Sequence, residues 1–335
     1  MNRKVHFALI NMLRLNLGLL PVIALCLGLR VNAQVVGFYN LENLFDTIDA
    51  PGVADEDFTP AGKLQYNTER MTTKVHNLSA VLDSCFVSRE ALLIGMCEVE
   101  NRLVVDLLRK QLNRPSLAIL HYESPDQRGI DNAILFDSTR LTLELSGHER
   151  VPLGATQRPT RDILWAVYKR NDDPTRMLVF VNHWPSRYGG AEETKWKRMQ
   201  ASETLTRLID SLTAVYPESR LLVMGDFNDT PADESLLKLA DRCNLVNLSE
   251  WMERAGLGTH AYRGAYHALD QVLIDRNWYN RLRAHGLEPK AETCAYPWMT
   301  YRSEKDGNLY PSRTYSGTRY FGGYSDHLPV TVVLE

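Results

Sequence analysis

The sequence is poor in cysteine and in long apolar runs, and it lacks an excess of positive charge. One of its 5 cysteines lies near the N-terminus, and the others, Cys85, Cys97, Cys243 and Cys294, follow no zinc-binding spacing. Beyond residue 33 no apolar stretch is long enough to cross a membrane. These absences exclude a zinc-ribbon protein and a polytopic membrane protein, and they leave the pairing of the cysteines open.

The N-terminal segment has the pattern of a cleaved secretory signal. Arg3 and Lys4 precede an apolar run that ends near Leu29, and Val31 and Ala33 occupy the small-residue positions that a signal peptidase requires. The pattern predicts a signal peptide over residues 1–33, export to the periplasm or the extracellular space, and no membrane span in the mature chain. An uncleaved anchor is the alternative, although the run is short for a span of about 20 residues.

Removal of this signal would make the chain acidic. Residues 1–33 contain four basic and no acidic side chains, which leaves 34 basic against 41 acidic residues and a net charge of −7. Proteins that bind DNA by neutralising many phosphates are usually basic. Any contact with nucleic acid therefore requires a local basic patch or a bridging cation.

Short apolar runs rich in Val, Ile and Leu predict buried strands. They cover residues 35–39, 91–97, 132–136, 163–168, 177–181, 220–224, 271–274 and 328–334. Helical spacing predicts helices over 71–86 and 205–215, and a capping-box-like start at Thr230 predicts a third over 231–240. No repeat or long linker interrupts the pattern, so we expect one α/β domain from residue 34 to 335.

Chemically active side chains recur where these apolar runs end. Glu98 follows the second run, Asp226 and Asn228 follow the sixth, and Asp326 and His327 precede the last. Turns explain polar residues at such places, but they do not require Glu, Asp and His at so many of them. Sheets of this class carry their sites at strand ends, so we expect a site here.

Several of these side chains suit a hard divalent cation. Mg²⁺ prefers oxygen ligands and keeps several water molecules. Glu98 is the first candidate, and Asp326 with Glu42 or Asn40 follows it. Glu100 competes with Glu98 for the same role, because the segment "CEVEN" offers both carboxylates.

The histidines suit proton transfer and phosphate binding. Asp270, at the start of another strand, can orient His327, and an Asp–His pair gives the tautomer and basicity that a general base requires. The segment "VNHWPSR" adds His183 and Arg187, which can stabilise charge on phosphate. The chain has no Walker loop, H-E-x-x-H helix or G-x-S-x-G nucleophile, which favours metal-assisted attack by water.

Six segments in order resemble the motifs of the endonuclease/exonuclease/phosphatase superfamily, which includes deoxyribonuclease-like and exonuclease III-like enzymes. They are "FYNLENL", "GMCEVEN", "VNHWPSR", "GDFNDTP", "LDQVLID" and "YSDHLPV", spread over residues 38–330. Any one of them would occur by chance, whereas six in order are specific. The resemblance implies a four-layered α/β sandwich, with two packed mixed β-sheets flanked by helices. It also implies Mg²⁺- or Mn²⁺-dependent cleavage of a phosphoester, with similarity to exported bacterial members. We further expect a monomer.

The resemblance assigns the metal side of the site. It makes Glu98 the principal metal ligand, with Asn40 beside it and Asp326 close to the metal. Glu42 stands where many members have Asp, so its role as a further ligand is less secure.

The resemblance also assigns the catalytic side. Asp226 and Asn228 would bind and activate the water or a second metal and position the phosphate, and His327 paired with Asp270 would be the general base or a phosphate contact. His183 would assist the leaving group or the transition state.

Two arginines are further candidates for the substrate phosphate, Arg128 in "DQRGIDNAILF" and Arg187. Residues 296–324 hold eight aromatic and four basic residues, a composition that suits stacked bases and phosphates and equally suits a folded insertion whose aromatics pack on themselves. Residues 184–198 form a second basic and aromatic stretch.

Three hypotheses about function remain open. The first is an exported nuclease, which the His183 segment favours. The second is a phospholipid (sphingomyelinase-like) or sugar/inositol-phosphate phosphoesterase, which the acidic charge favours. The third is a non-catalytic binding module on the same fold, against which the presence of Glu98, Asp226 and His327 speaks.

Overall fold

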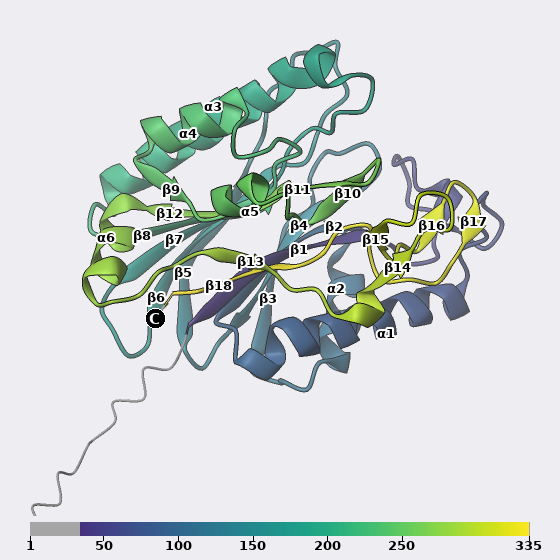
Figure 1. The fold of residues 1–335 in the computed structure, drawn as a ribbon, viewed down its shortest axis with the longest axis horizontal. Helices are drawn as coiled ribbons and strands as arrows, with labels where there is room; N and C mark the ends of the chain where they lie inside the picture. Colours follow the sequence, from purple (N-terminus) through teal and green to yellow (C-terminus); the bar gives the residue numbers. More distant parts are fainter. Residues whose placement is uncertain (1–33, 335) are drawn as a thin grey trace, which may run out of the picture. The chain divides into compact units, whose positions relative to one another are not determined.

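The computed structural model describes residues 34–334, and these residues form four layers (Figure 1). The predicted signal peptide over residues 1–33 lies outside the described residues. Within residues 34–334, no helix combines the length and apolar character that a membrane crossing requires.

Two six-stranded sheets form the inner layers. The first sheet has the strand order β13 (Ala291–Thr293), β18 (Val330–Val333), β1 (Val35–Leu44), β2 (Leu93–Val99), β4 (Asp131–Asp137) and β3 (Leu117–His121). The second has the order β5 (Leu141–Glu149), β6 (Ile163–Arg170), β7 (Arg176–His183), β8 (Arg220–Asp226), β12 (Asp270–Asp275) and β9 (Leu245–Asn247). Both are mixed, since β1–β2 and β7–β8 are parallel and their neighbours antiparallel.

Helices cover the outer face of each sheet (Figure 1). Helices α1 (Thr68–Cys85) and α2 (Arg102–Gln111) lie on the first sheet, and α3 (Ala191–Val215) and α4 (Glu234–Arg242) lie on the second. Shorter elements complete the chain: α5 (Glu250–Arg254), α6 (Arg276–Ala284), and the hairpins β10–β11 (His260–Tyr262, Ala265–His267), β14–β15 (Thr300–Arg302, Leu309–Pro311) and β16–β17 (Tyr315–Ser316, Arg319–Tyr320). The predicted four-layered α/β sandwich is confirmed.

Alternation along the strands of the two large sheets divides their apolar side chains among three cores. Phe38 and Met224 belong to the core between the sheets, whereas Ile94 packs under α1 and Phe180 under α3. Gly95 lies where the two sheets approach each other closely, because a Cβ atom there would come within 2.7 Å of the Met224 sulfur. Because these strands are covered on both faces of their sheet, their sequences are continuous apolar runs.

All eight predicted apolar runs form strands, and four strands of the two large sheets were missed, namely β3, β5, β9 and β13. The missed strand β5 has a half-exposed pattern, and β3 is short. The third predicted helix starts later than expected, at Glu234. The physical reason is a turn in which the Asp233 carboxylate accepts hydrogen bonds from the Thr230 backbone N–H at 2.6 Å and from the Thr230 hydroxyl at 2.9 Å.

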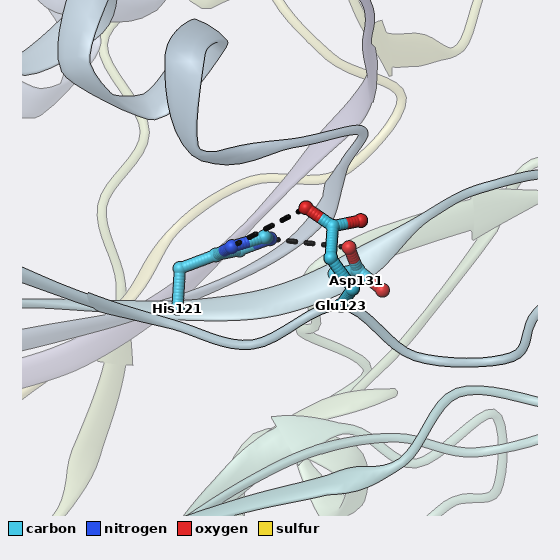
Figure 2. Close-up of side chains that lie close together, drawn as sticks. All are labelled: His121, Glu123 and Asp131. Carbon is cyan, nitrogen blue, oxygen red and sulfur yellow. Dashed lines mark hydrogen bonds and ion pairs between the residues drawn. The ribbon is translucent and has the colours of Figure 1, made fainter. Parts of the chain in front are cut away.

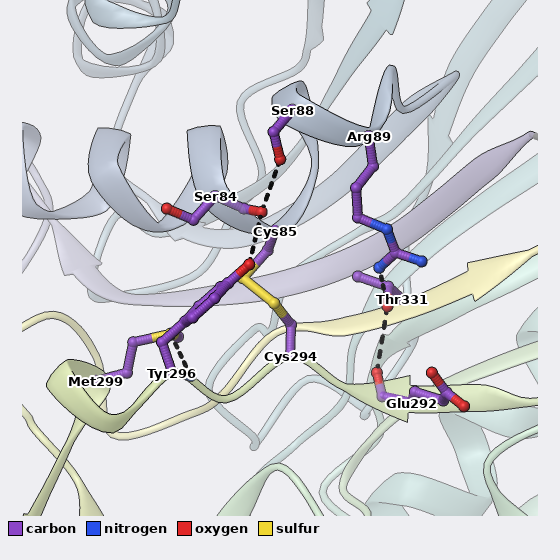
Figure 3. The surroundings of a disulfide bond; sticks show 9 residues. All are labelled: Ser84, Cys85, Ser88, Arg89, Glu292, Cys294, Tyr296, Met299 and Thr331. Carbon is purple, nitrogen blue, oxygen red and sulfur yellow. Dashed lines mark hydrogen bonds between the residues drawn. A yellow bond between two sulfur atoms is a disulfide. The ribbon is translucent and has the colours of Figure 1, made fainter.

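The disulfide Cys85–Cys294 answers the question that the cysteine spacing left open (Figure 3). It joins residues 209 positions apart and ties the end of α1 to the start of residues 294–324, named here the C-terminal insertion. Beside it the Tyr296 hydroxyl donates to the Ser84 carbonyl at 3.3 Å. Cys97 and Cys243 are free. The insertion is therefore anchored covalently to the helical layer of the first sheet.

Candidate active site

Irregular backbone at the ends of β1 and β2 presents the first group of polar side chains. The register between these strands shifts from Asn40 to Leu44, and the register of β2 with β4 shifts from Cys97 to Val99. Glu98 lies inside the second shift with a φ of 58°, in the left-handed region that side chains other than Gly seldom adopt. Such bulges re-aim a side chain, and strain of this kind concentrates at functional sites.

The second sheet contributes three side chains that lie in register. His183 on β7 and Asp270 on β12 both pair with Asp226 on β8, so the three residues lie side by side at one edge of the sheet. Gly225 makes the close approach of β7 and β8 possible, because a Cβ atom there would come within 2.2 Å of the Asn182 carbonyl oxygen. This edge faces the ends of β1 and β2, since Asn40 contacts Asp226 across the sandwich.

Asp226 is the centre of the site. Its Oδ2 atom accepts a hydrogen bond from the Asn40 amide at 3.1 Å and lies 3.8 Å from Nε2 of both His183 and His327. His183 Nε2 also lies 3.8 Å from Oε1 of Glu98. We name these residues, together with the partner of His327, the Glu98–Asp226 cluster: Asn40, Glu98, His183, Asp226, Asp270 and His327. The predicted site residues that lie far apart in the sequence are thus brought together here.

Asp270 and His327 form the predicted pair. His327 Nδ1 lies 2.6 Å from Asp270 Oδ2, and the same carboxylate oxygen accepts a hydrogen bond from the Thr259 hydroxyl. Asp270 is fully buried. The ring of His260 lies beside that of His327, with ring centroids 4.8 Å apart. These contacts fix the ring of His327 and direct its Nε2 atom toward Asp226.

The two histidines have opposite protonation preferences. Burial disfavours the charged form of His327, but Asp270 and Asp226 outweigh it and raise the pKa of His327 well above its usual value. Burial, with the positive charges of Arg161 and Arg128, lowers the pKa of His183 well below its usual value. Burial also raises the pKa of Asp226 to about 6. Titratable groups whose pKa values are driven apart are typical of acid–base sites.

A second pair of carboxylates lies beside this cluster and has different partners. Glu42 Oε2 accepts a hydrogen bond from the Thr314 backbone N–H at 2.6 Å and lies 3.6 Å from the buried Lys74 ammonium. Arg313 donates from Nε to Glu42 at 3.3 Å and from Nη2 to Asp326 at 2.9 Å. We name Glu42, Lys74, Arg313 and Asp326 the Glu42–Asp326 cluster. Two of the predicted metal ligands therefore lie in ion pairs with cationic side chains.

Asn228 and Arg187 lie in the loop that supports Asp226. The Asn228 backbone N–H donates to Asp226 Oδ1 at 2.9 Å, and its side-chain amide donates to the Trp184 carbonyl at 3.0 Å. Arg187 donates to the Asn228 carbonyl at 2.7 Å, to Asp229 at 2.9 Å and to Asp233 at 2.6 Å. The contacts of Arg187 thus hold the loop, and none of them is with the Glu98–Asp226 cluster.

Arg128 is half exposed and lies 3.7 Å from Asp126. Asp126 also accepts a hydrogen bond at 3.2 Å from Arg161, which the sequence did not single out. Arg161 is buried, donates to the Trp184 carbonyl at 2.6 Å, and has an Nε atom without a partner among the described residues. Both arginines act electrostatically on His183, so a positive region borders the cluster on that side.

The comparisons with known proteins bear on this geometry. A family model described as the endonuclease/exonuclease/phosphatase family matches residues 35–335. The chain belongs to this family. No curated protein sequence matches it.

Solved structures show the same fold at low sequence identity. A mannosyl-6-phosphatase of Bacteroides thetaiotaomicron is 14% identical, with a TM-score of 0.59 over 90% of this chain and 100% of that one. The human Nocturnin catalytic domain with bound sulfate is 15% identical, with a TM-score of 0.54 over 90% and 93%. TDP2 of D. rerio in its humanised form is 12% identical, with a TM-score of 0.53 over 91% and 99%.

Family members are generally metal-dependent, and the Glu98–Asp226 cluster fits a hard cation. Glu98 Oε2 accepts a hydrogen bond from the Asn43 backbone N–H at 3.0 Å, which leaves Oε1 directed toward His183. Asp226, Asp270 and His327 offer ligand atoms within 4.8 Å of one another, and Asp270 Oδ1 is buried without a partner among residues 34–334. Glu100, the competitor of Glu98, instead accepts the Asp46 backbone N–H at 2.5 Å.

Four side chains around the site were missed or left without a role by sequence reasoning. Lys74 had a signal, because it lies between Met71 and Val75 on the apolar face of a predicted helix. Arg161 precedes an apolar run, which is a weak signal, and nothing in the sequence places His260 beside His327. Arg313 was noted within an aromatic stretch, and only the fold brings it to Glu42.

A second group of ligand-type side chains lies at the end of β3 and the start of β4 (Figure 2). His121 Nε2 lies 3.1 Å from Asp131 Oδ2, and its Nδ1 lies 3.9 Å from the exposed Glu123. The Ser124 backbone N–H donates to the other oxygen of Asp131 at 2.7 Å. This group shares no residue with the Glu98–Asp226 cluster.

Proposed function

We propose that the protein hydrolyses a phosphoester by attack of a water molecule, with a divalent cation, Mg²⁺ or Mn²⁺, bound at the Glu98–Asp226 cluster. The observation that carries this proposal is the position of Asp226, whose Oδ2 lies 3.8 Å from Nε2 of both His183 and His327. Glu98, Asn40 and Asp226 would hold the cation, which when bound would neutralise phosphate charge and lower the pKa of a bound water.

His327 is the proposed proton acceptor. Asp270 holds Nδ1 of the ring, so that Nε2 is the atom available to the water. The raised pKa of His327 makes it a strong base, and a positive charge beside Asp226 would favour its neutral, accepting form. After proton transfer the charged ring would be stabilised by Asp270 and Asp226, as in other Asp–His pairs.

His183 has a separate proposed role on the leaving-group side. Its pKa is lowered, so the neutral ring would donate a hydrogen bond to the phosphate without carrying a charge of its own. Arg128 and Arg161 would contribute the positive charge on that side, and Arg128 is exposed enough to reach a phosphate oxygen. Asn228 positions Asp226 through its backbone N–H.

The substrate that we propose to test first is a nucleic acid, cleaved by an exported nuclease. The His183 segment supports this choice, together with the positive region formed by Arg128 and Arg161. Export is supported by the disulfide Cys85–Cys294, because disulfides persist in oxidising compartments.

A small phosphoester is the second candidate, and the packing of the aromatic residues favours it. In the C-terminal insertion Tyr296 stacks on Trp298 with centroids 5.5 Å apart, and Tyr301 stacks on Tyr310 at 6.0 Å. Trp184 of the other basic and aromatic stretch is buried. These rings are thus partly engaged with the protein, and one protein of similar fold is a mannosyl-6-phosphatase.

Nicking of supercoiled plasmid by the purified protein tests the proposal. We expect nicking in Mg²⁺, none in EDTA, and nicking slowed about 10²-fold with His327→Gln, while His285→Gln, an exposed histidine, should behave as wild type. A folded protein that cleaves neither plasmid nor a panel of sugar phosphates and bis(p-nitrophenyl) phosphate would contradict the hydrolase proposal. Cleavage of the small esters alone would contradict only the nuclease.

A further inference from the structure

Arg313 lies where two carboxylates of the predicted metal set face each other. Its Nε and Nη2 atoms contact Glu42 at 3.3 Å and Asp326 at 2.9 Å, so one guanidinium bridges both side chains. Its remaining terminal nitrogen, Nη1, has no partner among the described residues, and the side chain is 42% exposed. The two carboxylates therefore hold the Arg313 guanidinium through Nε and Nη2, and Nη1 can still donate to a bound ligand.

The formal charges of the Glu42–Asp326 cluster balance. Glu42 and Asp326 carry two negative charges, and Lys74 and Arg313 carry two positive ones. Lys74 is fully buried and also donates to the Thr314 hydroxyl at 2.7 Å and to the Tyr324 carbonyl at 2.6 Å, so it is a fixed part of the structure. A divalent cation that bound between Glu42 and Asp326 would gain no attraction from a net negative charge, and it would have to displace the Arg313 guanidinium.

The Glu98–Asp226 cluster has the opposite balance. Glu98, Asp226 and Asp270 are three carboxylates, and no Lys or Arg among residues 34–334 makes an ion pair with them. Even with His327 charged, this cluster keeps an excess of negative charge, which a single divalent cation would neutralise. The two clusters adjoin each other, because Asp326 is next to His327 in the chain and the Glu42 backbone N–H donates to Asn40 at 2.9 Å.

From these observations, and resting on the proposed function, we propose that Arg313 takes the place of a second divalent cation between Glu42 and Asp326. The active site would then hold one metal ion, at the Glu98–Asp226 cluster, and the C-terminal insertion would supply the second positive charge as a guanidinium. Nη1 would contact a phosphate oxygen of the substrate. Glu42 and Asp326 would orient Arg313 by accepting its hydrogen bonds, and they would not be metal ligands.

Counting bound ions tests this proposal directly. We would titrate the metal-free full chain with Mn²⁺ and measure free Mn²⁺ by electron paramagnetic resonance, with calorimetry as a second method. We expect one bound ion in the wild type and two in Arg313→Gln. Removal of the guanidinium leaves the carboxylates of Glu42 and Asp326 without this cationic partner, so that they can bind a second ion. The double variant Arg313→Gln/Asp326→Asn should return to one ion. Arg302→Gln, a matched change on the same insertion, should bind one.

Asp326→Asn alone gives a test that does not depend on the folding of the Arg313 variant. Asp326 is partly exposed and its amide would still accept from Arg313. We expect its affinity for the single ion to change less than threefold, whereas a true ligand would lose at least tenfold. Two ions on the wild type, one ion on a folded Arg313→Gln, or a tenfold loss in Asp326→Asn would each overturn the proposal about Arg313. No bound ion on any variant would instead overturn the proposed function and this inference with it.

Discussion

Two neighbouring groups of carboxylates in this molecule have the same residue types and different partners. Glu98 and Asp226 face histidines and amides, at 3.8 Å from His183 in both cases. Glu42 and Asp326 face Arg313, and Glu42 also faces Lys74. A carboxylate that already has a cationic partner has less need of a metal ion, whereas an unpaired buried carboxylate is costly unless a cation compensates it. The partners of the carboxylates, and not the acids themselves, therefore distinguish the proposed metal centre from the ion-pair network.

The largest effect expected from this comparison is that of Glu98→Gln. It removes the charge of the principal proposed ligand, so we expect about a 10³-fold loss of kcat/KM, since several kcal/mol of charge stabilisation would be lost. Mn²⁺ affinity should fall in parallel. Glu100→Gln is the matched control, because burial raises the pKa of Glu100 to about 8 and its carboxyl is already mostly neutral at pH 7. Equal losses in both variants would refute the assignment.

The next effect is that of His327→Gln, which removes the proposed base and leaves the metal side intact. General-base catalysis typically contributes 10²–10⁴-fold, and we expect a loss of about 10²-fold in kcat. The affinity for Mn²⁺ should change little. A large loss of kcat with an unchanged Mn²⁺ affinity is the result that distinguishes a base from a metal ligand. A variant that keeps its kcat, or that loses its metal ion, would show that His327 has a different role.

A smaller effect concerns His260, whose ring lies beside that of His327. Burial, with the charge of His327, lowers the pKa of His260 to about 4, so the folded state favours the neutral ring. The unfolded chain would take up this proton below about pH 6.5, and stability is therefore present above pH 6.5 and lost as the pH falls toward 4.

Urea unfolding at pH 5 and pH 7.5 measures this contribution. We expect the wild type to lose roughly 2 kcal/mol more than His260→Asn between the two pH values. His285→Asn, on the exposed end of α6, should follow the wild type. A His260→Asn protein with the same pH dependence as the wild type would contradict the lowered pKa.

The smallest effect expected is that of Asp326→Asn on activity. If this residue serves Arg313 and binds no metal, its loss should reduce kcat/KM by less than tenfold, which is under about 1.4 kcal/mol. Steady-state assays beside Glu98→Gln would check the ranking. A loss as large as that of Glu98→Gln would erase the distinction between the two clusters.

Much of the fold could be predicted from residue patterns, because strands buried on both faces leave continuous apolar runs. All eight such runs form strands, whereas β5 was missed because one of its faces is exposed. The start of α4 was misplaced because the side chain of Asp233 closes a turn with Thr230 that competes with the helix. Local hydrogen bonds of this kind have no periodic signature.

The fold class and the family followed from the residue pattern alone, since the ordered motifs and the strand-end positions are local features, and the same features gave the candidate site residues that the fold brings together. Which cationic side chains pair with which carboxylates depends on how the chain packs. Lys74 comes from a helix and Arg313 from an insertion 271 residues after Glu42, and charge pairing at that separation depends on packing alone. Coulomb energy depends on distance in space, so a candidate ligand in the chain becomes a metal ligand or a salt-bridge partner only when the fold sets its neighbours.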